Sequence, residues 1–506
     1  MAFIPSIVNW LNNKRINQIE LFKKFPVETQ NEVLYGLIAK ASGTEWGRKY
    51  DYSSISSLKD YQNRIPVQTY EELIPFVDRL RNGECNLLWP GEIKWFAKSS
   101  GTTSAKSKFI PLSRESLEDC HYRGGRDMIV VYTYNKPETK IFNGKGLILG
   151  GSHQINNFSN NSLCGDLSAI LIENAPFWVD LIRTPKTKIA LLEDFEEKLN
   201  QITELTVNEN VTNISGVPSW YLVLFKQILA FTGKKNLREV WPNLEVFFHG
   251  GISFVPYREQ FMNFIPGKEM NYMESYNASE GFFGLQDDPS TNDMLLMLDL
   301  GVFYEFIPFD KINSDSPPVY TIGDVEPGVN YAIVISTNGG LWRYMIGDTI
   351  VFTNVNPHKF KISGRTKEFI NAFGEEVISD NAEKALETAC KATGALIAEY
   401  TAGPVFIEAD SKGSHEWIIE FEKEPSDLSL FTDLLDEALK SVNSDYEAKR
   451  FKDLNLVKPV IRAAPGGTFY KWLRTKNKLG GQNKVPRLSN TREYIEDLYV
   501  IMGIKR

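Results

Sequence analysis

A run of small hydroxyl residues around one glycine, at positions 99–108, constrains this chain more than any other stretch. A strand-like run, Ile93 to Ala97, precedes it, and Ser113 follows at the N-cap position of a helical pattern. Glycine lets the backbone approach an anion closely, turn amides and hydroxyls donate hydrogen bonds, and lysine adds positive charge. The run therefore favours a phosphate-binding loop formed by Ser99, Ser100, Gly101, Thr102, Thr103, Ser104 and Lys108. A serine-rich surface turn explains the same residues equally well, and the spacing of a Walker loop is absent.

The length and charge of the chain narrow its class. A chain of 506 residues is too long for one ordinary core, so we expect a large domain and a smaller one. A hydrophobic content of 42% with 24% charged residues is typical of a well-packed globular protein. The net charge of -8 argues against a general nucleic-acid binder, so a small-molecule substrate is the better expectation.

The cysteines and the hydropathy bear on the compartment. The four cysteines are scattered without a CxxC pair, so neither a zinc site nor a disulfide framework is indicated. No stretch approaches the ~20 apolar residues that a membrane helix needs. The sequence therefore predicts a cytoplasmic protein that binds neither nucleic acid nor membrane.

The order of the periodic segments predicts the fold class. Apolar residues at helical spacing over 5–40, broken at Pro26, and over 70–80 predict helices near the N-terminus. From 140 to 310, strand-like runs alternate with helical patterns, which is typical of sheets covered by helices. Asn338-Gly339-Gly340 predicts a tight turn between strands at 331–336 and 341–346.

After Gly364-Arg365-Thr366 the pattern changes to a compact α+β unit. Helices are expected at 381–392, 427–442 and 468–476, and strands at 404–408, 416–421 and 457–462. We therefore predict an α/β protein with a large domain over 1–368, a connecting segment at 369–374 and a small domain over 375–506.

The stretch from Tyr272 to Gly281 places an aromatic ring, hydroxyls and a carboxylate in one turn after a strand. In a nucleotide site, Tyr276 would stack on a base, Ser279 would contact a phosphate and Glu280 would hold Mg²⁺. Magnesium uses one or two protein carboxylates together with the phosphates of its substrate. The simpler interpretation is that these side chains only border a turn.

Two later stretches carry a single charged residue each. Asp348 ends the run from Trp342, where its carboxylate could accept both ribose hydroxyls, although an aspartate after glycine is more often only a turn former. Lys484 lies in the polar loop from Gly480 to Arg487, and a lone loop lysine is usually just solvated. Neither stretch is specific by itself.

The order of these motifs carries a resemblance along nearly the whole chain. The sequence resembles the acyl-adenylate-forming superfamily of firefly luciferase and acyl-CoA synthetases, and within it the auxin-responsive Gretchen Hagen family of acyl acid amido synthetases. Ser99 to Lys108 is similar to the family's phosphate loop, Tyr276 to Glu280 to its second nucleotide motif, and Tyr344 to Asp348 to its third. Gly364 to Gly374 is similar to the hinge segment of the superfamily, and Gln482 to Arg487 to the C-terminal lysine motif of the family.

The resemblance implies a two-step reaction and a two-domain fold. A carboxylic acid would attack the α-phosphate of ATP to give an acyl-adenylate and pyrophosphate, and the amine of an amino acid would then displace AMP. The large domain of helix-covered β-sheets would bind ATP and the acid. The small, mobile α+β domain would carry the catalytic lysine and rotate about the hinge at 369–374 between the two steps.

The resemblance also implies a role for each motif residue. The residues from Ser99 to Ser104 and Lys108 would hold the phosphates, and Ser279 would contact the α-phosphate. Gly250, Gly251 and Tyr276 would bracket adenine, Asp348 would hold the ribose, and Arg365 would help to fix the nucleotide. Glu280 would bind Mg²⁺ and Lys484 would catalyse adenylation, while Asn277 is a further residue expected to bind the cofactor.

Three residues outside the motifs are further candidates. Arg123 and Arg126, on a helix predicted from Ser113 to Val131, could bind the carboxylate of the acid, since a guanidinium matches it bidentately. A solvated arginine is the commoner case. His249 precedes the two glycines, where a single histidine at a strand end is more often structural.

Two alternatives to the amido synthetase stay open. A coenzyme A ligase of the same superfamily shares the first half-reaction, although the short small domain ending in the lysine motif favours the amide former. A nucleotide-binding module without turnover would keep the fold, and the retention of Glu280, Asp348 and Lys484 together argues against it.

Overall fold

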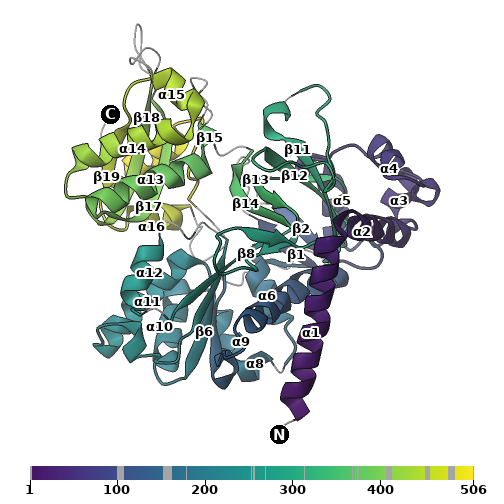
Figure 1. Cartoon of the computed structure of the whole chain (residues 1–506), viewed down its shortest axis with the longest axis horizontal. Helices are drawn as coiled ribbons and strands as arrows, with labels where there is room; N and C mark the ends of the chain where they lie inside the picture. Colours follow the sequence, from purple (N-terminus) through teal and green to yellow (C-terminus); the bar gives the residue numbers. More distant parts are fainter. Residues whose placement is uncertain are drawn as a thin grey trace.

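The computed structural model describes residues 3–99, 108–151, 162–177, 179–251, 254, 257–267, 269–312, 314–366, 369–370, 372, 375, 377–405, 413–450, 456–476 and 485–504. Within them, an eleven-stranded sheet forms the centre of the N-terminal part, and a three-stranded sheet forms the centre of the C-terminal unit (Figure 1). This mixed architecture confirms the predicted α/β class.

The large sheet joins an antiparallel half to a parallel half. Its spatial order is β11 (Val302–Pro308), β12 (Asn330–Thr337), β13 (Tyr344–Val355), β14 (His358–Arg365), β10 (Met294–Leu296), β9 (Gly281–Leu285), β8 (Asn271–Ala278), β7 (Val246–Gly250), β6 (Val211–Gly216), β3 (Lys145–Leu149) and β5 (Arg183–Thr184). Neighbours from β11 to β8 pair antiparallel, and those from β8 to β5 pair parallel. The carboxyl ends of β3, β6, β7 and β8 therefore meet at one edge of the sheet.

Helices cover both faces of the parallel half, as such buried strands require. Figure 1 shows α10 (Phe195–Thr206), α11 (Pro218–Thr232) and α12 (Arg258–Phe264) on one side, and α6 (Tyr122–Asn135), α8 (Val179–Ile182) and α9 (Thr187–Ala190) on the other. The ring of Phe247 on β7 stacks on Phe261 of α12 at 4.8 Å. The remaining N-terminal helices are α1 (Phe3–Lys24), α2 (Pro26–Ala41), α3 (Glu45–Lys49), α4 (Leu58–Arg64), α5 (Tyr70–Arg81) and α7 (Leu167–Glu173). No helix in the described ranges is both long and apolar enough to cross a membrane.

Local sequence signals place several of these elements correctly. Pro26 occupies the first turn of α2, where its missing N–H costs nothing, so the predicted break between the two N-terminal helices is confirmed. Ser113 caps the next helical run, because its Oγ accepts the backbone N–H of Ser116 at 2.9 Å. That run includes a π-helix, η2 (Ser116–His121), and continues as α6.

The predicted tight turn at 338–340 is confirmed, because the backbone N–H of Gly340 donates to the carbonyl of Thr337 at 3.0 Å, but the predicted start of the next strand at 341 is wrong. Strands β12 and β13 do pair antiparallel, with Ile335 opposite Tyr344, but β13 begins only at Tyr344. The indole N–H of buried Trp342 donates to the carbonyl of Leu88 at 3.0 Å, and Arg343 has a φ of 44° in the left-handed region. These distant contacts hold residues 341–343 out of the strand.

A third sheet, in the order β2 (Lys108–Leu112), β1 (Trp95–Ser99) and β4 (Leu163–Gly165), carries the predicted phosphate loop. Strands β1 and β2 pair antiparallel with Ser99 opposite Lys108, so the two ends of the loop lie side by side. Residues 100–107 lie outside the described residues.

The C-terminal unit has its own interior. Its sheet is β17 (Leu396–Val405), β18 (Ser414–Lys423) and β19 (Val460–Ala464), with β15 (Phe369–Ile370) and β16 (Val377–Ile378) paired nearby. Its helices are α13 (Ser379–Thr393), α14 (Leu428–Val442), α15 (Ser444–Arg450), α16 (Thr468–Thr475) and α17 (Glu493–Met502). Its two apolar clusters contain only residues from 370 onward. Residues 371, 373 and 374 lie outside the described ranges, and the hinge at 369–374 stays a prediction.

A buried ion pair fixes the entry to β13. The guanidinium of Arg343 donates to both carboxylate oxygens of Glu305 on β11, at 2.8 and 2.9 Å, and also to the carbonyl of Gln62. The two side chains are only 4% and 1% exposed. Removing one partner of such a pair leaves a buried, uncompensated charge.

We expect Arg343→Met to lower the free energy of unfolding by about 3–5 kcal/mol, because Glu305 would keep its charge without a cation. Urea denaturation followed by circular dichroism measures this. Arg114→Met is the control, since Arg114 pairs with Glu118 on the surface and is 83% exposed. A denaturation midpoint equal in the two variants would contradict the prediction.

Candidate active site

A cavity of about 1810 Å³ lies at the edge of the sheet where β3, β6, β7 and β8 end. Its lining includes every predicted site residue whose side chain the structure describes: Lys108, Gly250, Gly251, Tyr276, Asn277, Ser279, Glu280, Asp348 and Arg365. Ser99 ends β1, while Ser100, Gly101, Thr102, Thr103, Ser104 and Lys484 lie outside the described residues. Segments far apart in the sequence therefore share one cavity, and the individual roles stay predictions.

Two glycines at the end of β7 are required for different reasons. A Cβ on Gly250 would lie 2.5 Å from the carbonyl oxygen of Ser275, so only glycine permits the close approach of β7 to β8. Gly251 has a φ of 85°, which L side chains rarely adopt. The pair gives a wall of bare backbone at this point of the cavity.

Ser279 and Glu280 form the two-residue connection of the β8–β9 hairpin, between the paired residues Ala278 and Gly281. Hairpin tips normally face solvent, but these side chains are buried. Burial raises the pKa of Glu280 above its ordinary value, and the nearby Lys108 acts in the opposite direction. A cation bound next to Glu280 would stabilise the charged form of this buried carboxylate.

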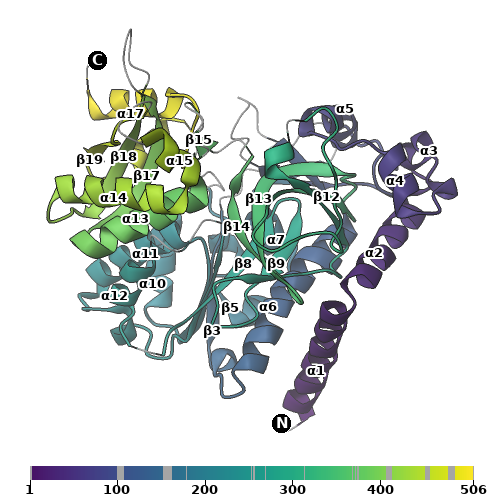
Figure 2. The same cartoon turned by 45° about the horizontal axis from the view of Figure 1, so that its top comes forward.

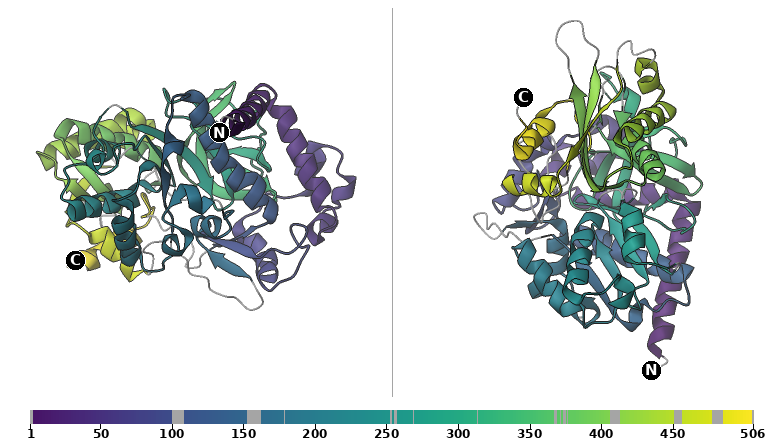
Figure 3. Two further views of the ribbon diagram at one scale, coloured as in Figure 1. Left: turned by 90° about the horizontal axis from the view of Figure 1, so that it is seen from below. Right: turned by 90° about the vertical axis from the view of Figure 1, so that its left-hand side faces the viewer.

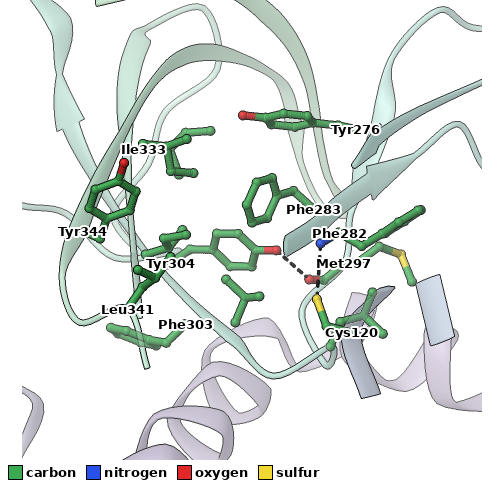
Figure 4. Packing of buried hydrophobic residues seen from close by; sticks show 14 of the residues in the cluster. Cys120, Tyr276, Phe282, Phe283, Met297, Phe303, Tyr304, Ile333, Leu341 and Tyr344 are labelled. Atoms are coloured by element: carbon green, nitrogen blue, oxygen red, sulfur yellow. Dashed lines mark hydrogen bonds between the residues drawn. The ribbon is translucent and has the colours of Figure 1, made fainter. Parts of the chain in front are cut away.

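Asp348 is held between two donors. Strands β13 and β14 place it directly opposite Arg365, whose Nε donates to Asp348 Oδ1 at 2.9 Å. The hydroxyl of Tyr276 donates to Asp348 Oδ2 at 2.5 Å. The ring of Tyr276 packs on Phe283 with ring centres 4.9 Å apart (Figure 4). The second and third motifs are therefore joined directly, and a ribose would share this carboxylate with Tyr276 and Arg365.

Lys108 connects the phosphate loop to the third motif. Its ammonium donates to the hydroxyl of Tyr344 at 3.1 Å. Tyr344 is buried, and burial together with the charge of Glu280 raises the pKa of its phenol well above the ordinary value. The neutral phenol oxygen of Tyr344 therefore accepts a hydrogen bond from the charged ammonium of Lys108.

The sequence motifs do not include His121, which forms a hydrogen bond with Asn277. Its Nδ1 lies 2.8 Å from Asn277 Oδ1, and both residues line the cavity. Burial lowers the pKa of His121 to about 4, so the ring is neutral near pH 7 and donates from Nδ1. His121 lies in a π-helix, and the sequence carries no signal for that element.

The two arginines predicted as candidates to bind the carboxylate of the acid, Arg123 and Arg126, have different surroundings. The guanidinium of Arg123 donates to Asp299 Oδ2 at 2.9 Å and therefore supports α6 from outside the cavity. Arg126 lines the cavity and has no ion-pair partner within the described residues. His249 packs against Phe247 and Phe254 and also lines the cavity, and burial lowers its pKa to about 3, so its ring is neutral near pH 7.

The C-terminal unit closes the far side of the cavity. Figure 2 shows it above α11 and α12, and Figure 3 shows it from two further sides. Val485 and Arg487, which follow Lys484 in the lysine motif, line the cavity together with Glu383 of α13. Arg487 also donates to the hydroxyl of Tyr257 at 3.0 Å, across the boundary between the two parts.

Glu274 on β8 is a second residue that the motifs did not reveal. It lines the cavity, and its backbone N–H donates to Gln286 Oε1 at 3.2 Å. Burial raises its pKa to about 7, and Glu383 across the boundary acts in the same direction. Arg258 and Lys361 oppose the shift. The carboxylate is therefore poised to change its charge near neutral pH.

A carboxyl group whose folded pKa is raised binds its proton more tightly in the folded state, so its burial costs stability once it ionises. Wild type should therefore lose stability relative to Glu274→Gln between about pH 4.5 and pH 7. Because Glu274 lies at a cavity wall, we expect a difference of about 1–2 kcal/mol at pH 8 and none at pH 4. Urea denaturation across this range measures it. Glu204→Gln, at an exposed position, is the control, and a pH-independent difference would contradict the prediction.

Comparison with known proteins shows which protein family this chain matches. Residues 15–270, 295–365 and 380–493 match the GH3 family N-terminal, central and C-terminal domains. The chain is 24% identical to the indole-3-acetic acid-amido synthetase GH3.4 of Arabidopsis thaliana, over 94% of this chain and 91% of that protein.

Solved structures show the same fold. The GH3.15 acyl acid amido synthetase is 18% identical, with a TM-score of 0.78 over 96% of this chain and 95% of that one. A 2-hydroxyisobutyryl-CoA ligase in its postadenylation state is 13% identical, with a TM-score of 0.59 over 94% and 91%. The resemblance inferred from the motifs is thus confirmed: this chain belongs to the GH3 family and has the fold of acyl-adenylate-forming ligases.

Proposed function

We propose that this chain is an ATP-dependent acyl acid amido synthetase, a ligase that joins a carboxylic acid to the amine of an amino acid through an acyl-adenylate. The observation that carries the proposal is the convergence of Glu280, Asp348 and Arg487, from three motifs, on one cavity. Membership of a family whose relatives are named amido synthetases supports it.

In the first step, a carboxylate oxygen of the acid attacks the α-phosphorus of ATP, and the bond to pyrophosphate breaks. Arg126, which lines the cavity, would bind that carboxylate. Lys108 and Arg365 supply positive charge on the nucleotide side. Negative charge gathers at the attacked phosphorus, so a cation that arrives there acts where charge develops, and this is the role of Lys484.

Glu280 is the residue that would hold Mg²⁺. The fit rests on its donor chemistry: a buried carboxylate with a raised pKa gains from a cation. No group of three or more metal-ligating side chains occurs within the described residues. That agrees with magnesium's use of one carboxylate and the phosphates of the substrate. When bound, the ion neutralises charge on the phosphate oxygens.

In the second step, the amine nitrogen attacks the carbonyl carbon of the acyl-adenylate, the bond to AMP breaks and the nitrogen loses a proton. The C-terminal unit is the small domain that presents Lys484 for the first step. It then turns about the hinge at 369–374 to admit the amine. Its separate apolar clusters support movement as a body.

Pyrophosphate exchange over a panel of aryl and alkyl acids tests the first step. AMP release with amino acids, compared with coenzyme A, then tests the acceptor. Acid-dependent exchange followed by AMP release with amino acids is the expected result. Release with coenzyme A alone would favour the thioester-forming ligase, and exchange with none of the acids would favour a nucleotide-binding module.

We expect Lys484→Ala to slow pyrophosphate release by about 100-fold or more, because the transition state loses a positive charge at the attacked phosphorus. ATP binding should change little, which calorimetry with the intact protein checks. Lys471→Ala removes an exposed lysine of the same unit that does not line the cavity, and is the matched control. Pyrophosphate release at the wild-type rate in Lys484→Ala would rule out the assigned role.

A further inference from the structure

The end of the lysine motif is fixed to the C-terminal unit by its backbone. The carbonyl of Pro486 accepts the hydroxyl of Thr401 at 2.7 Å. The carbonyl of Arg487 accepts the backbone N–H of Ala402 at 2.9 Å, and Leu488 forms a parallel bridge with Ala402. This end of the motif therefore runs along the edge of β17 and belongs to the C-terminal unit.

The side chain of Arg487 crosses the boundary between the two parts of the chain. Its guanidinium pairs with Glu399 of β17 and lies over the ring of Tyr400, with Cζ 4.6 Å from the ring centre. Its Nη2 donates to the hydroxyl of Tyr257 in the N-terminal part at 3.0 Å. Because protein groups surround this guanidinium and Glu399 balances its charge, it is better suited to join the two parts than to bind a phosphate.

The partner of this hydrogen bond in the N-terminal part is equally well fixed. Tyr257 immediately precedes α12, is 1% exposed and belongs to an apolar cluster of the N-terminal part. The side chain of Arg487 is 14% exposed. Water competes poorly at such a place, so a hydrogen bond from a charged donor contributes more there than at the surface.

Burial distinguishes this hydrogen bond from another tyrosine contact at the boundary. Tyr470 of α16 donates to Glu196 at 2.9 Å, but that bond is exposed to solvent. Water can replace an exposed partner at little cost in free energy. Arg487 also follows Lys484 by three positions in the chain, so its contact acts on the motif itself.

We propose that Arg487 is a positioning residue: by donating to Tyr257, it holds the lysine motif and the C-terminal unit against the N-terminal part for adenylation. This rests on the proposed function in assigning adenylation to the cavity. In the second step the C-terminal unit turns to admit the amine, so the contact with Tyr257 is required for the first step and not for the second.

Tyr257→Phe tests the proposal, because it removes the hydroxyl and keeps the ring that packs in the apolar cluster. Tyr470→Phe is the matched control, since it removes a hydroxyl that donates across the same boundary from an exposed position. Two rates are measured in each protein. The first is pyrophosphate exchange with ATP and the acid of the panel that wild type uses fastest, and the second is aminolysis of the synthetic adenylate of that acid. Thermal unfolding verifies that the variants are folded.

Tyr257→Phe should lower kcat/KM for pyrophosphate exchange by about tenfold or more and change the rate of aminolysis by less than about twofold. Tyr470→Phe should leave both rates within about twofold of wild type. In an Arg487→Gln background, adding Tyr257→Phe should cost less than about twofold further, because the two side chains act through one bond. An equal loss in both steps, or unchanged exchange, would overturn the inference.

Labelling of a native thiol gives a second readout that requires no turnover. Cys390 of α13 is half-buried, and burial followed by the charge of Glu259 on α12 raises its pKa to about 12. Separating the two parts would take Glu259 away from the thiol, and the thiolate is the form that reacts. N-ethylmaleimide should therefore label Cys390 about threefold or more faster in Tyr257→Phe than in wild type or Tyr470→Phe, as followed by peptide mass spectrometry.

Equal labelling in the three proteins would overturn the inference. Absence of exchange in wild type with every acid would instead reject the proposed function. Faster labelling in Tyr257→Phe would then still support Arg487 and Tyr257 as the bond that holds the two parts together.

Discussion

The site depends on compensating the negative charge of two buried carboxylates that line the cavity, Asp348 and Glu280. A buried negative charge is costly unless cations or hydrogen-bond donors lie next to it. Asp348 meets this condition through Tyr276 and Arg365, and Lys108 lowers the cost of the charge on Glu280. Because these five residues come from β8, β13, β14, β2 and the β8–β9 turn, charge compensation holds together segments that the chain order keeps far apart.

The chain uses glycine in this region for three separate physical purposes. Gly250 allows two strands to approach, and Gly251 adopts a left-handed backbone. Gly125 leaves volume unfilled at a helix surface. The sequence does not show which of these reasons applies to each glycine. Only the atoms around a hypothetical Cβ distinguish a backbone requirement from an open space.

Signals that act over a few residues were readable from the sequence. Pro26 and Ser113 marked helix starts, the alternation of strands and helices gave the fold class, and the motif around Tyr276 fell on the cavity. Contacts between distant segments were not readable. Arg123 and Arg126 lie three positions apart on one helix, and only Asp299, far along the chain, distinguishes them.

The same limitation of local signals explains what the motifs left out. Residues 341–343 stay outside β13 because Trp342 bonds to Leu88, and no turn statistic contains that partner. Glu274 belongs to no recognisable motif, and its perturbed pKa depends on burial and on Glu383 in the C-terminal unit. The full shift in the pKa of Glu274 therefore arises only when the C-terminal unit packs against the N-terminal part.

The surface between these two parts is joined by polar side chains. Lys226 pairs with Glu422 at 2.6 Å, Tyr470 donates to Glu196 at 2.9 Å, and Gln260 donates to the carbonyl of Ile397 at 3.0 Å. The apolar clusters of the described residues each stay on their own side. Water can replace each of these polar partners, so separating the parts along this surface divides none of the apolar clusters that the described residues form. The chain thus keeps a stable interior on either side of a boundary that solvent can enter.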